Sequence, residues 1–187
     1  MPSLPRGGIA FAALLFASSI IAGYWFASYL EPGGNGVLRE LKSVFKPFFS
    51  LSPLELMLLI LVNNAVKALL VVLLGFALCL FPLLFTIGNG LILGFVAYHT
   101  LRFKGLILTV ASLAPHGVLE IPAIILASGL GFEVGFEAWR KLFKRKSQLK
   151  SKLKLGLKTY ATIILPVLAL AAAVEAFITP IIAFLLS

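Results

Sequence analysis

A histidine and a carboxylate stand four residues apart, as His116 and Glu120, inside an apolar run from Leu106 to Leu130. A run of this length is typical of a helix that crosses a membrane. Ionisable side chains in such a helix are costly unless they are paired or hydrated, so they are candidates for a functional site. In a regular helix the two side chains would lie side by side. They could hold a metal ion, take part in transport or join helices.

Polar side chains from other apolar runs fall at a similar depth when positions are converted to distance at about 1.5 Å per residue. The full set of buried polar candidates is His116, Glu120, Asn63, Asn64, Lys67, Asn89 and Glu175. Lys67 needs an anion, and Glu120 and Glu175 are the only acids deep enough to supply one. We therefore predict that Lys67 pairs with one of these two glutamates.

Structural roles compete with functional ones at these positions. For Asn63, Asn64 and Asn89, hydrogen bonding between helices is the favoured interpretation. For His116 with Glu120, structure and function are equally supported. The second histidine, His99, is expected as a polar tip at the membrane interface.

A metal site is the weaker chemical alternative. His116, Glu120 and Glu175 together would supply three ligands for a divalent ion such as zinc, the minimum that zinc sites usually have. No other cofactor is indicated. The chain has no His-Glu-x-x-His motif, no aspartate and no serine with an evident base. These absences argue against an enzyme without deciding the question.

The composition is that of an integral membrane protein. Of 187 residues, 60% are apolar and 12% are charged, whereas soluble domains carry about 25% charged residues. The mean hydropathy is +1.07. We predict one integral membrane domain over residues 1–187, in a cell membrane, with the lipid bilayer as its first partner.

The apolar runs predict an all-α polytopic fold with about five spans. These spans cover about 7–30, 53–81, 83–101, 106–130 and 160–186. Pro115, Gly117 and Pro122 interrupt the fourth span, because proline and the residue before it disfavour regular helix. Either the helix kinks there, or two half-helices meet and form a re-entrant hairpin.

Two amphipathic helices are predicted in the membrane interface, over 37–46 and 132–146. Nine of the sixteen Lys and Arg residues fall within 140–158. This segment is predicted to be a cytoplasmic loop that attracts anionic lipid headgroups, with the N-terminus also cytoplasmic. Nucleic acid is not expected as a partner, because the cluster borders membrane segments.

Several motifs resemble the stage II sporulation protein M family of integral membrane proteins. They are Val62–Asn64, Gly88–Gly94, Pro115–Ala123 and Glu175–Pro180, of which the Pro-His-Gly-x-x-Glu piece is the most specific. The family's namesake acts in spore-forming bacteria as a membrane scaffold for cell-wall-degrading enzymes. Relatives also occur in organisms that never sporulate. The resemblance implies a fold, a site and, more faintly, a scaffold role.

Two functions follow as hypotheses. The first is a non-catalytic membrane scaffold, with other membrane or envelope proteins as partners and a dimer formed through small residues at Gly90, Gly94 and Ala171–Ala173. The second is an oligomeric transporter or channel for a small solute or ion that uses the midplane polar cluster. A dry, closely packed cluster would count against transport.

Overall fold

The computed structural model describes residues 4–30 and 51–185, apart from the side chains of residues 112, 115, 116, 183 and 184. All regular elements in the described part are helices. Five of them are long and apolar enough to cross a membrane, which confirms the predicted all-α class of polytopic membrane protein. The interfacial helix predicted over 37–46 lies outside the described residues.

Helix α3 (Pro53–Leu73) shows how local sequence fixes a helix start. Ser52 caps the helix: its hydroxyl accepts the backbone N–H of Glu55 at 3.4 Å, and the Glu55 carboxylate accepts the Ser52 backbone N–H at 2.8 Å. This reciprocal capping box satisfies two backbone donors at the helix end. A 3₁₀ turn, η2 (Leu74–Phe76), ends the segment, five residues before the predicted end of the second span.

The longest element, α4 (Leu80–Leu142), reverses its direction at Gly105. We call residues 80–104 the first arm of α4 and residues 106–142 its second arm. Gly105 has φ 77° and ψ 175°, a conformation that is essentially restricted to glycine. The boundary between the predicted third and fourth spans is therefore a single glycine.

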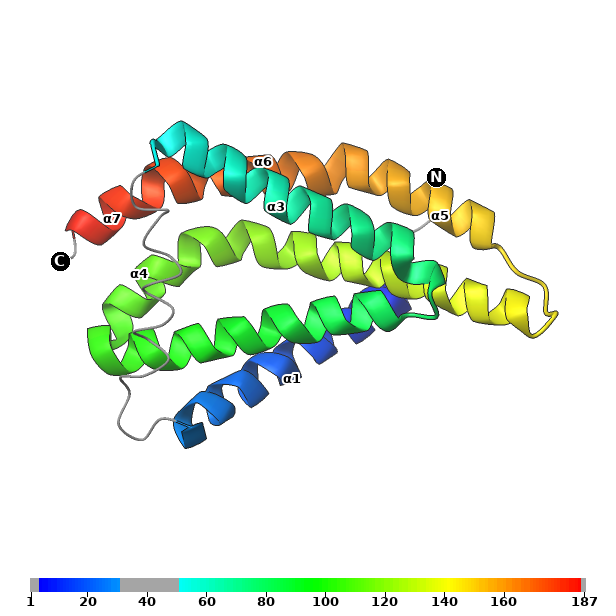
Figure 1. Ribbon diagram of the computed structural model, residues 1–187, viewed down its shortest axis with the longest axis horizontal. Coiled ribbons are helices and arrows are strands. Elements are labelled where there is room, and N and C mark those ends of the chain that lie inside the picture. The colour runs from blue at the N-terminus through cyan, green and yellow to red at the C-terminus, as the bar shows by residue number, and fades with distance from the viewer. Residues whose placement is uncertain (1–3, 31–50, 186–187) are drawn as a thin grey trace.

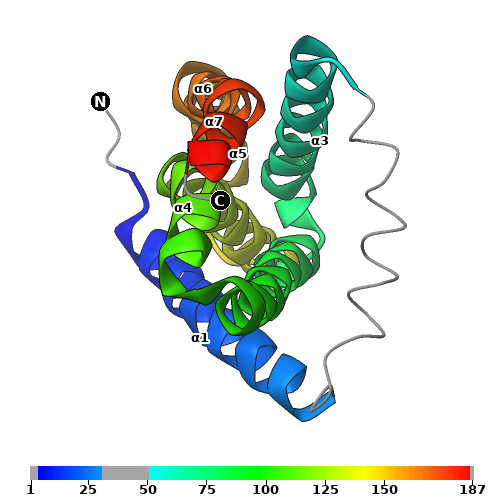
Figure 2. The same cartoon turned by 90° about the vertical axis from the view of Figure 1, so that its left-hand side faces the viewer.

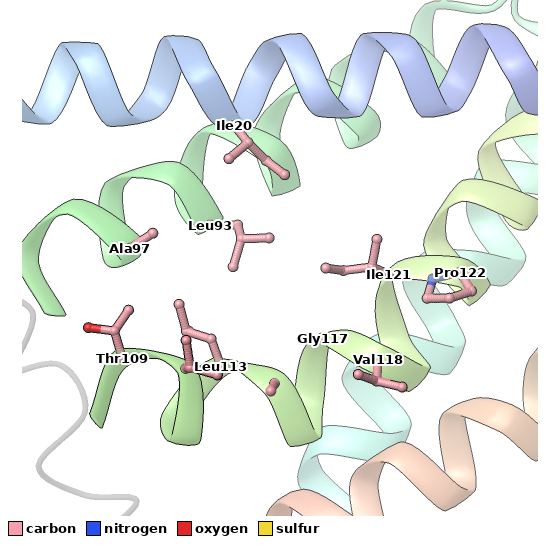
Figure 3. Close-up of a pocket in the computed structure, with 11 residues that line it drawn as sticks. Ile20, Leu93, Ala97, Thr109, Leu113, Gly117, Val118, Ile121 and Pro122 are labelled. Atoms are coloured by element: carbon pink, nitrogen blue, oxygen red, sulfur yellow. The ribbon is translucent and has the colours of Figure 1, made fainter. Parts of the chain in front are cut away.

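The second arm bends where the sequence predicts a break at Pro115, Gly117 and Pro122. Its backbone stays helical from residue 106 to residue 142, so the chain does not turn back as a re-entrant hairpin. Figure 3 shows the ribbon changing direction between Gly117 and Val118. Proline removes one helical hydrogen bond and crowds the preceding turn, which bends a helix without ending it.

The second arm is also longer than predicted. It runs to Leu142, so residues 132–142 continue the second arm instead of forming the separate amphipathic helix predicted over 132–146. Phe132, expected at the membrane surface, is 1% exposed. Its ring packs edge-on against Phe11 of α1 (Arg6–Leu30), with 4.9 Å between the ring centroids. The contact with α1 explains why this stretch belongs to the core.

The last part of the chain is a nearly continuous helical rod. Its parts are α5 (Leu149–Thr159), η3 (Tyr160–Ile164), α6 (Leu165–Ala173), η4 (Val174–Ile178) and α7 (Thr179–Leu185). The predicted basic loop over 140–158 is thus mostly helix. η3 and η4 are widened π turns, and each ends two residues before a proline, Pro166 or Pro180. The missing N–H of proline accounts for this widening.

The helices pack in layers, with α3 and the rod α5–α7 beside each other over the second arm of α4 (Figures 1 and 2). A core cluster joins these three elements, including Val71 and Val72 of α3, Leu130 of α4 and Ile164 and Leu168 of the rod. α1 crosses both arms of α4. The start of α1 and the α4–α5 hairpin lie at the same end of the molecule.

The small-residue faces predicted to form a dimer are used inside the chain. A β-carbon at Gly90 would stand 2.9 Å from the carbonyl oxygen of Phe16, and one at Gly94 would stand 2.8 Å from the backbone nitrogen of Tyr24. Both contacts are with α1. Ala171 and Ala172 are buried in the core. The GxxxG pair therefore brings α1 close to the first arm of α4.

Candidate functional site

Three of the seven predicted polar candidates surround one small cavity in the core. Its lining residues are Asn64, Ala68, Phe85, Asn89, Glu120, Ile124 and Leu168. The cavity measures about 10 Å³, which is near the lower limit for holding one water molecule. The rest of its wall is apolar, so the site is a small polar layer within the packed helices. We call Asn64, Asn89 and Glu120 the polar layer.

Each member of the polar layer comes from a different helical segment. Asn64 lies on α3, Asn89 on the first arm of α4 and Glu120 on the second arm, one turn beyond the bend at Gly117. Glu120 is 6% exposed. The Oδ1 of Asn64 accepts a hydrogen bond from Asn63 Nδ2 at 3.1 Å, and Asn89 Nδ2 donates to the carbonyl of Phe85 at 2.8 Å.

The remaining candidates on α3 and on the rod lie elsewhere. Asn63 and Lys67 are exposed on the outer face of α3. Glu175 lies in η4, where its carboxylate accepts a hydrogen bond from the Thr179 hydroxyl at 3.0 Å. The ion pairs Arg140–Glu137 and Lys152–Glu133 of the described residues do not involve Lys67, so its pairing with Glu120 or Glu175 stays a prediction.

The two histidines are placed differently. The backbone at His116 is helical, and its side chain lies outside the described residues. His99 is buried, contrary to the predicted interfacial tip. Its ring lies 4.4 Å from that of Phe95 and 5.2 Å from that of Tyr98, measured between centroids. His99 thus belongs to an aromatic cluster at the end of the first arm.

The metal hypothesis requires His116, whose side chain lies outside the described residues. Among the described residues, no three His, Cys, Asp or Glu side chains are close enough together to hold a metal ion. Glu175 does not line the cavity that Glu120 lines. Asn64 and Asn89 offer amide groups, which suit hydrogen bonding between helices better than zinc coordination.

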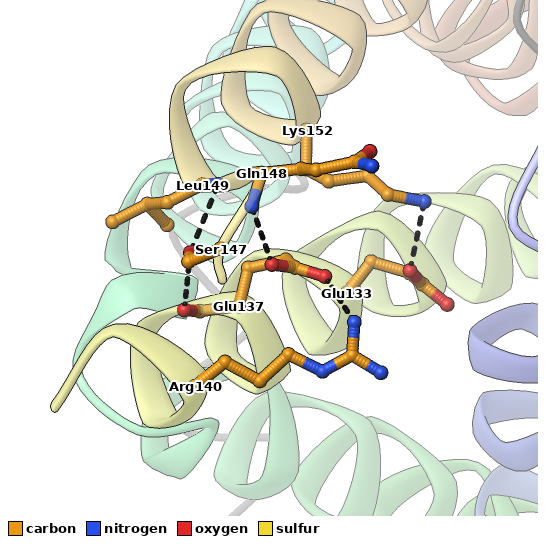
Figure 4. Close-up of polar contacts among 7 residues, drawn as sticks. All are labelled: Glu133, Glu137, Arg140, Ser147, Gln148, Leu149 and Lys152. Atoms are coloured by element: carbon orange, nitrogen blue, oxygen red, sulfur yellow. Dashed lines mark hydrogen bonds and ion pairs between the residues drawn. The ribbon is translucent and has the colours of Figure 1, made fainter. Parts of the chain in front are cut away.

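A second polar cluster, at the α4–α5 hairpin, was not predicted (Figure 4). Glu137 is 4% exposed and organises the connection. Its carboxylate accepts the backbone N–H of Gln148 at 2.6 Å and the guanidinium of Arg140 at 2.8 Å. Its backbone carbonyl accepts the Ser147 hydroxyl at 2.8 Å. One buried carboxylate therefore ties the end of α4 to the start of α5.

A second carboxylate extends this hairpin cluster by one helical turn. Glu133 forms an ion pair with Lys152 of α5 at 3.1 Å. The signal in the sequence is the pair of glutamates four residues apart, followed by a basic segment and a serine before the next helix. The interpretation of 132–146 as a separate surface helix directed both glutamates toward solvent and so concealed their role.

The fold and the polar layer define the class of protein. The chain is a polytopic helical membrane protein in which amide and carboxyl groups from three helical segments line one small cavity. The family model for stage II sporulation protein M matches residues 12–180. The chain belongs to that family, as its motifs indicated. It matches no curated protein and no solved structure.

Proposed function

We propose that this protein is a non-catalytic membrane scaffold that associates with another membrane protein through the outer face of α3. The observation that carries the proposal is the position of Lys67. It is exposed on a membrane-spanning helix, about 13 Å along the helix from Phe76 at 1.5 Å per residue. A charged side chain that faces lipid at this depth is costly. A partner with an acidic or carbonyl group would remove that cost.

The neighbourhood of Lys67 supports the same proposal. Asn63 is one helical turn away and also exposed, so the two polar side chains share one face. The neighbouring apolar residues Val62 and Val66 are also exposed. An apolar surface with two polar groups is what helix–helix association in a membrane uses. Another membrane protein or a second copy of the chain would fit this face.

The polar layer supports fastening rather than transport. A cavity of about 10 Å³ has no room for a hydrated ion or an organic solute. Asn64, Asn89 and Glu120 line one cavity between α3 and the two arms of α4, which supports a role in joining these helices.

The basic hairpin supports an orientation and a lipid contact. Basic residues of the hairpin and α5 include Lys144, Lys150 and Lys154. The start of α1 lies at the same end. Cytoplasmic segments of membrane proteins carry an excess of Lys and Arg, so this end faces the cytoplasm. There its basic residues meet anionic lipid headgroups.

Site-specific photocrosslinking tests the scaffold proposal. A photoreactive residue at Val62, introduced into the full chain in its native cell membrane, is expected to form a discrete protein adduct. Lys67→Met should abolish the adduct, and Lys67→Arg should retain it. A photoreactive residue at Ile107, which is exposed on α4, is the matched control and should give no such adduct.

The mass of the adduct distinguishes the partners. Twice the mass of the chain means a second copy, and any other discrete mass means a different protein. No protein adduct at Val62, together with normal insertion of the Lys67→Met variant, would contradict the proposal. Ion or solute flux through purified protein in liposomes, beyond that of empty liposomes, would restore the transport hypothesis.

A further inference from the structure

A large apolar groove lies between α1 and the two arms of α4 (Figure 3). It measures about 550 Å³, within the range of small-molecule sites. Ile20 of α1 and Leu93 and Ala97 of the first arm form one wall. The other wall is the bent part of the second arm, including Val118 and Ile121. The bend at Gly117 holds the two arms apart and so creates the groove.

Among the described side chains, the lining offers no spare polar group to a ligand. Thr109 is the one hydroxyl residue among them, and its hydroxyl donates to the carbonyl of Gly105 at 2.7 Å. Exposed apolar side chains continue from the groove along the second arm, among them Ile107 and Val110. This described surface matches a flexible apolar chain that arrives from the bilayer.

Positive charge stands at one end of the groove. The two arms converge at the turn around Gly105, where Arg102 and Lys104 are both exposed. The guanidinium of Arg102 donates to the Tyr98 hydroxyl at 2.7 Å and lies over the Tyr98 ring, 5.9 Å from its centroid. These contacts restrict Arg102 to one region. An anionic headgroup is complementary to these two cations.

We infer that the groove binds one anionic phospholipid, with an acyl chain between the arms of α4 and the headgroup at Arg102 and Lys104. Lipid tails are as apolar as leucine, so the tail alone gives little selectivity over bulk lipid. The headgroup supplies the preference, at about fivefold in affinity per basic residue. This site lies at the end of the molecule that holds the turn at Gly105, away from the basic α4–α5 hairpin.

Native mass spectrometry of the full chain in mild detergent tests this inference. Phosphatidylglycerol and phosphatidylcholine with the same acyl chains are the two probes. The wild type is expected to retain one phosphatidylglycerol in preference to phosphatidylcholine. Arg102→Gln with Lys104→Gln should reduce that preference by roughly 30-fold, as two basic residues are lost.

Blocking the groove separates this site from other lipid contacts. Ala97→Trp should fill the groove and remove the retained lipid. Ile92→Trp adds the same ring to an exposed position beside the groove and is the matched control. Val118→Trp on the opposite wall repeats the test if Ala97→Trp fails to fold. A diazirine in the acyl chain of phosphatidylglycerol should label residues 106–122.

Several results would overturn the inference. Equal retention of the two lipids by the wild type would remove the anionic preference. A preference that persists in Arg102→Gln with Lys104→Gln would place the lipid at the basic hairpin instead. Unchanged lipid retention in both Ala97→Trp and Val118→Trp would exclude the groove. Crosslinking of groove residues to a second copy would assign the groove to a protein.

Discussion

Replacing Gly94 by alanine is expected to destabilise the protein, although alanine is the better helix former. A β-carbon at this position would stand 2.8 Å from the backbone nitrogen of Tyr24 and 2.9 Å from the backbone carbonyl carbon of Ile20. These are backbone atoms, so no rotamer change relieves the contact. Overpacking of this kind costs about 1–3 kcal/mol. The helix propensity of alanine offsets up to about 1 kcal/mol. With the full offset, the expected net loss is about 0–2 kcal/mol.

Gly88→Ala is the matched control, because it lies on the same helix and a β-carbon there meets nothing within 4 Å. It is expected to be neutral or to stabilise by up to about 1 kcal/mol. Thermal melting of both variants in detergent measures the difference, at roughly 2–4 °C per kcal/mol for a chain of this size. Equal melting temperatures would refute the packing of α1 on the first arm. If Gly94→Ala abolished a dimer without changing the melting temperature, Gly94 would contact a second copy of the chain and not α1 of the same chain.

Three further outcomes are expected. Glu137→Ala removes a hydrogen bond from the Gln148 backbone to a buried carboxylate, so it should cost about 1.5–3 kcal/mol and speed tryptic cleavage of the hairpin; an unchanged cleavage rate would contradict its role. Tyr160→Phe removes the hydroxyl that donates to the Ala65 carbonyl at 3.0 Å and should cost about 1 kcal/mol, visible as a lower melting temperature; equal melting would count against that bond. Partial burial raises the pKa of the Cys79 thiol, so less thiolate is present at neutral pH and alkylation by maleimide should be slower in folded than in denatured protein; equal rates would contradict this shielding.

The sequence predicts the membrane class and the separation of the third and fourth apolar runs, because those features are local. A long apolar run implies a spanning helix whatever its neighbours are. Helix ends are harder to predict, because a spanning helix can continue past the membrane when another element covers it. Phe132 looked like the start of a surface helix, but α1 covers it through Phe11.

Only part of the candidate site was predicted, because the side of a helix that faces the core depends on its neighbours. Consecutive helix residues point about 100° apart, so Asn63 and Asn64 cannot both face the core. The residues around them are apolar on all sides, so periodicity does not say which asparagine is inside. The packing of α3 against α4 decides this: Asn64 lines the cavity, and Asn63 and Lys67 face outward.

The central claim is that the polar layer is closed and fastens the helices. Glu120→Cys, in a Cys79→Ser background, tests it with a membrane-impermeant thiol reagent added to either side of a proteoliposome. Ser147→Cys on the hairpin is the positive control. The account predicts rapid modification at position 147 and modification at position 120 only after denaturation. Modification of Glu120→Cys in the folded protein at a rate near that of Ser147→Cys would reveal an aqueous path and contradict the account.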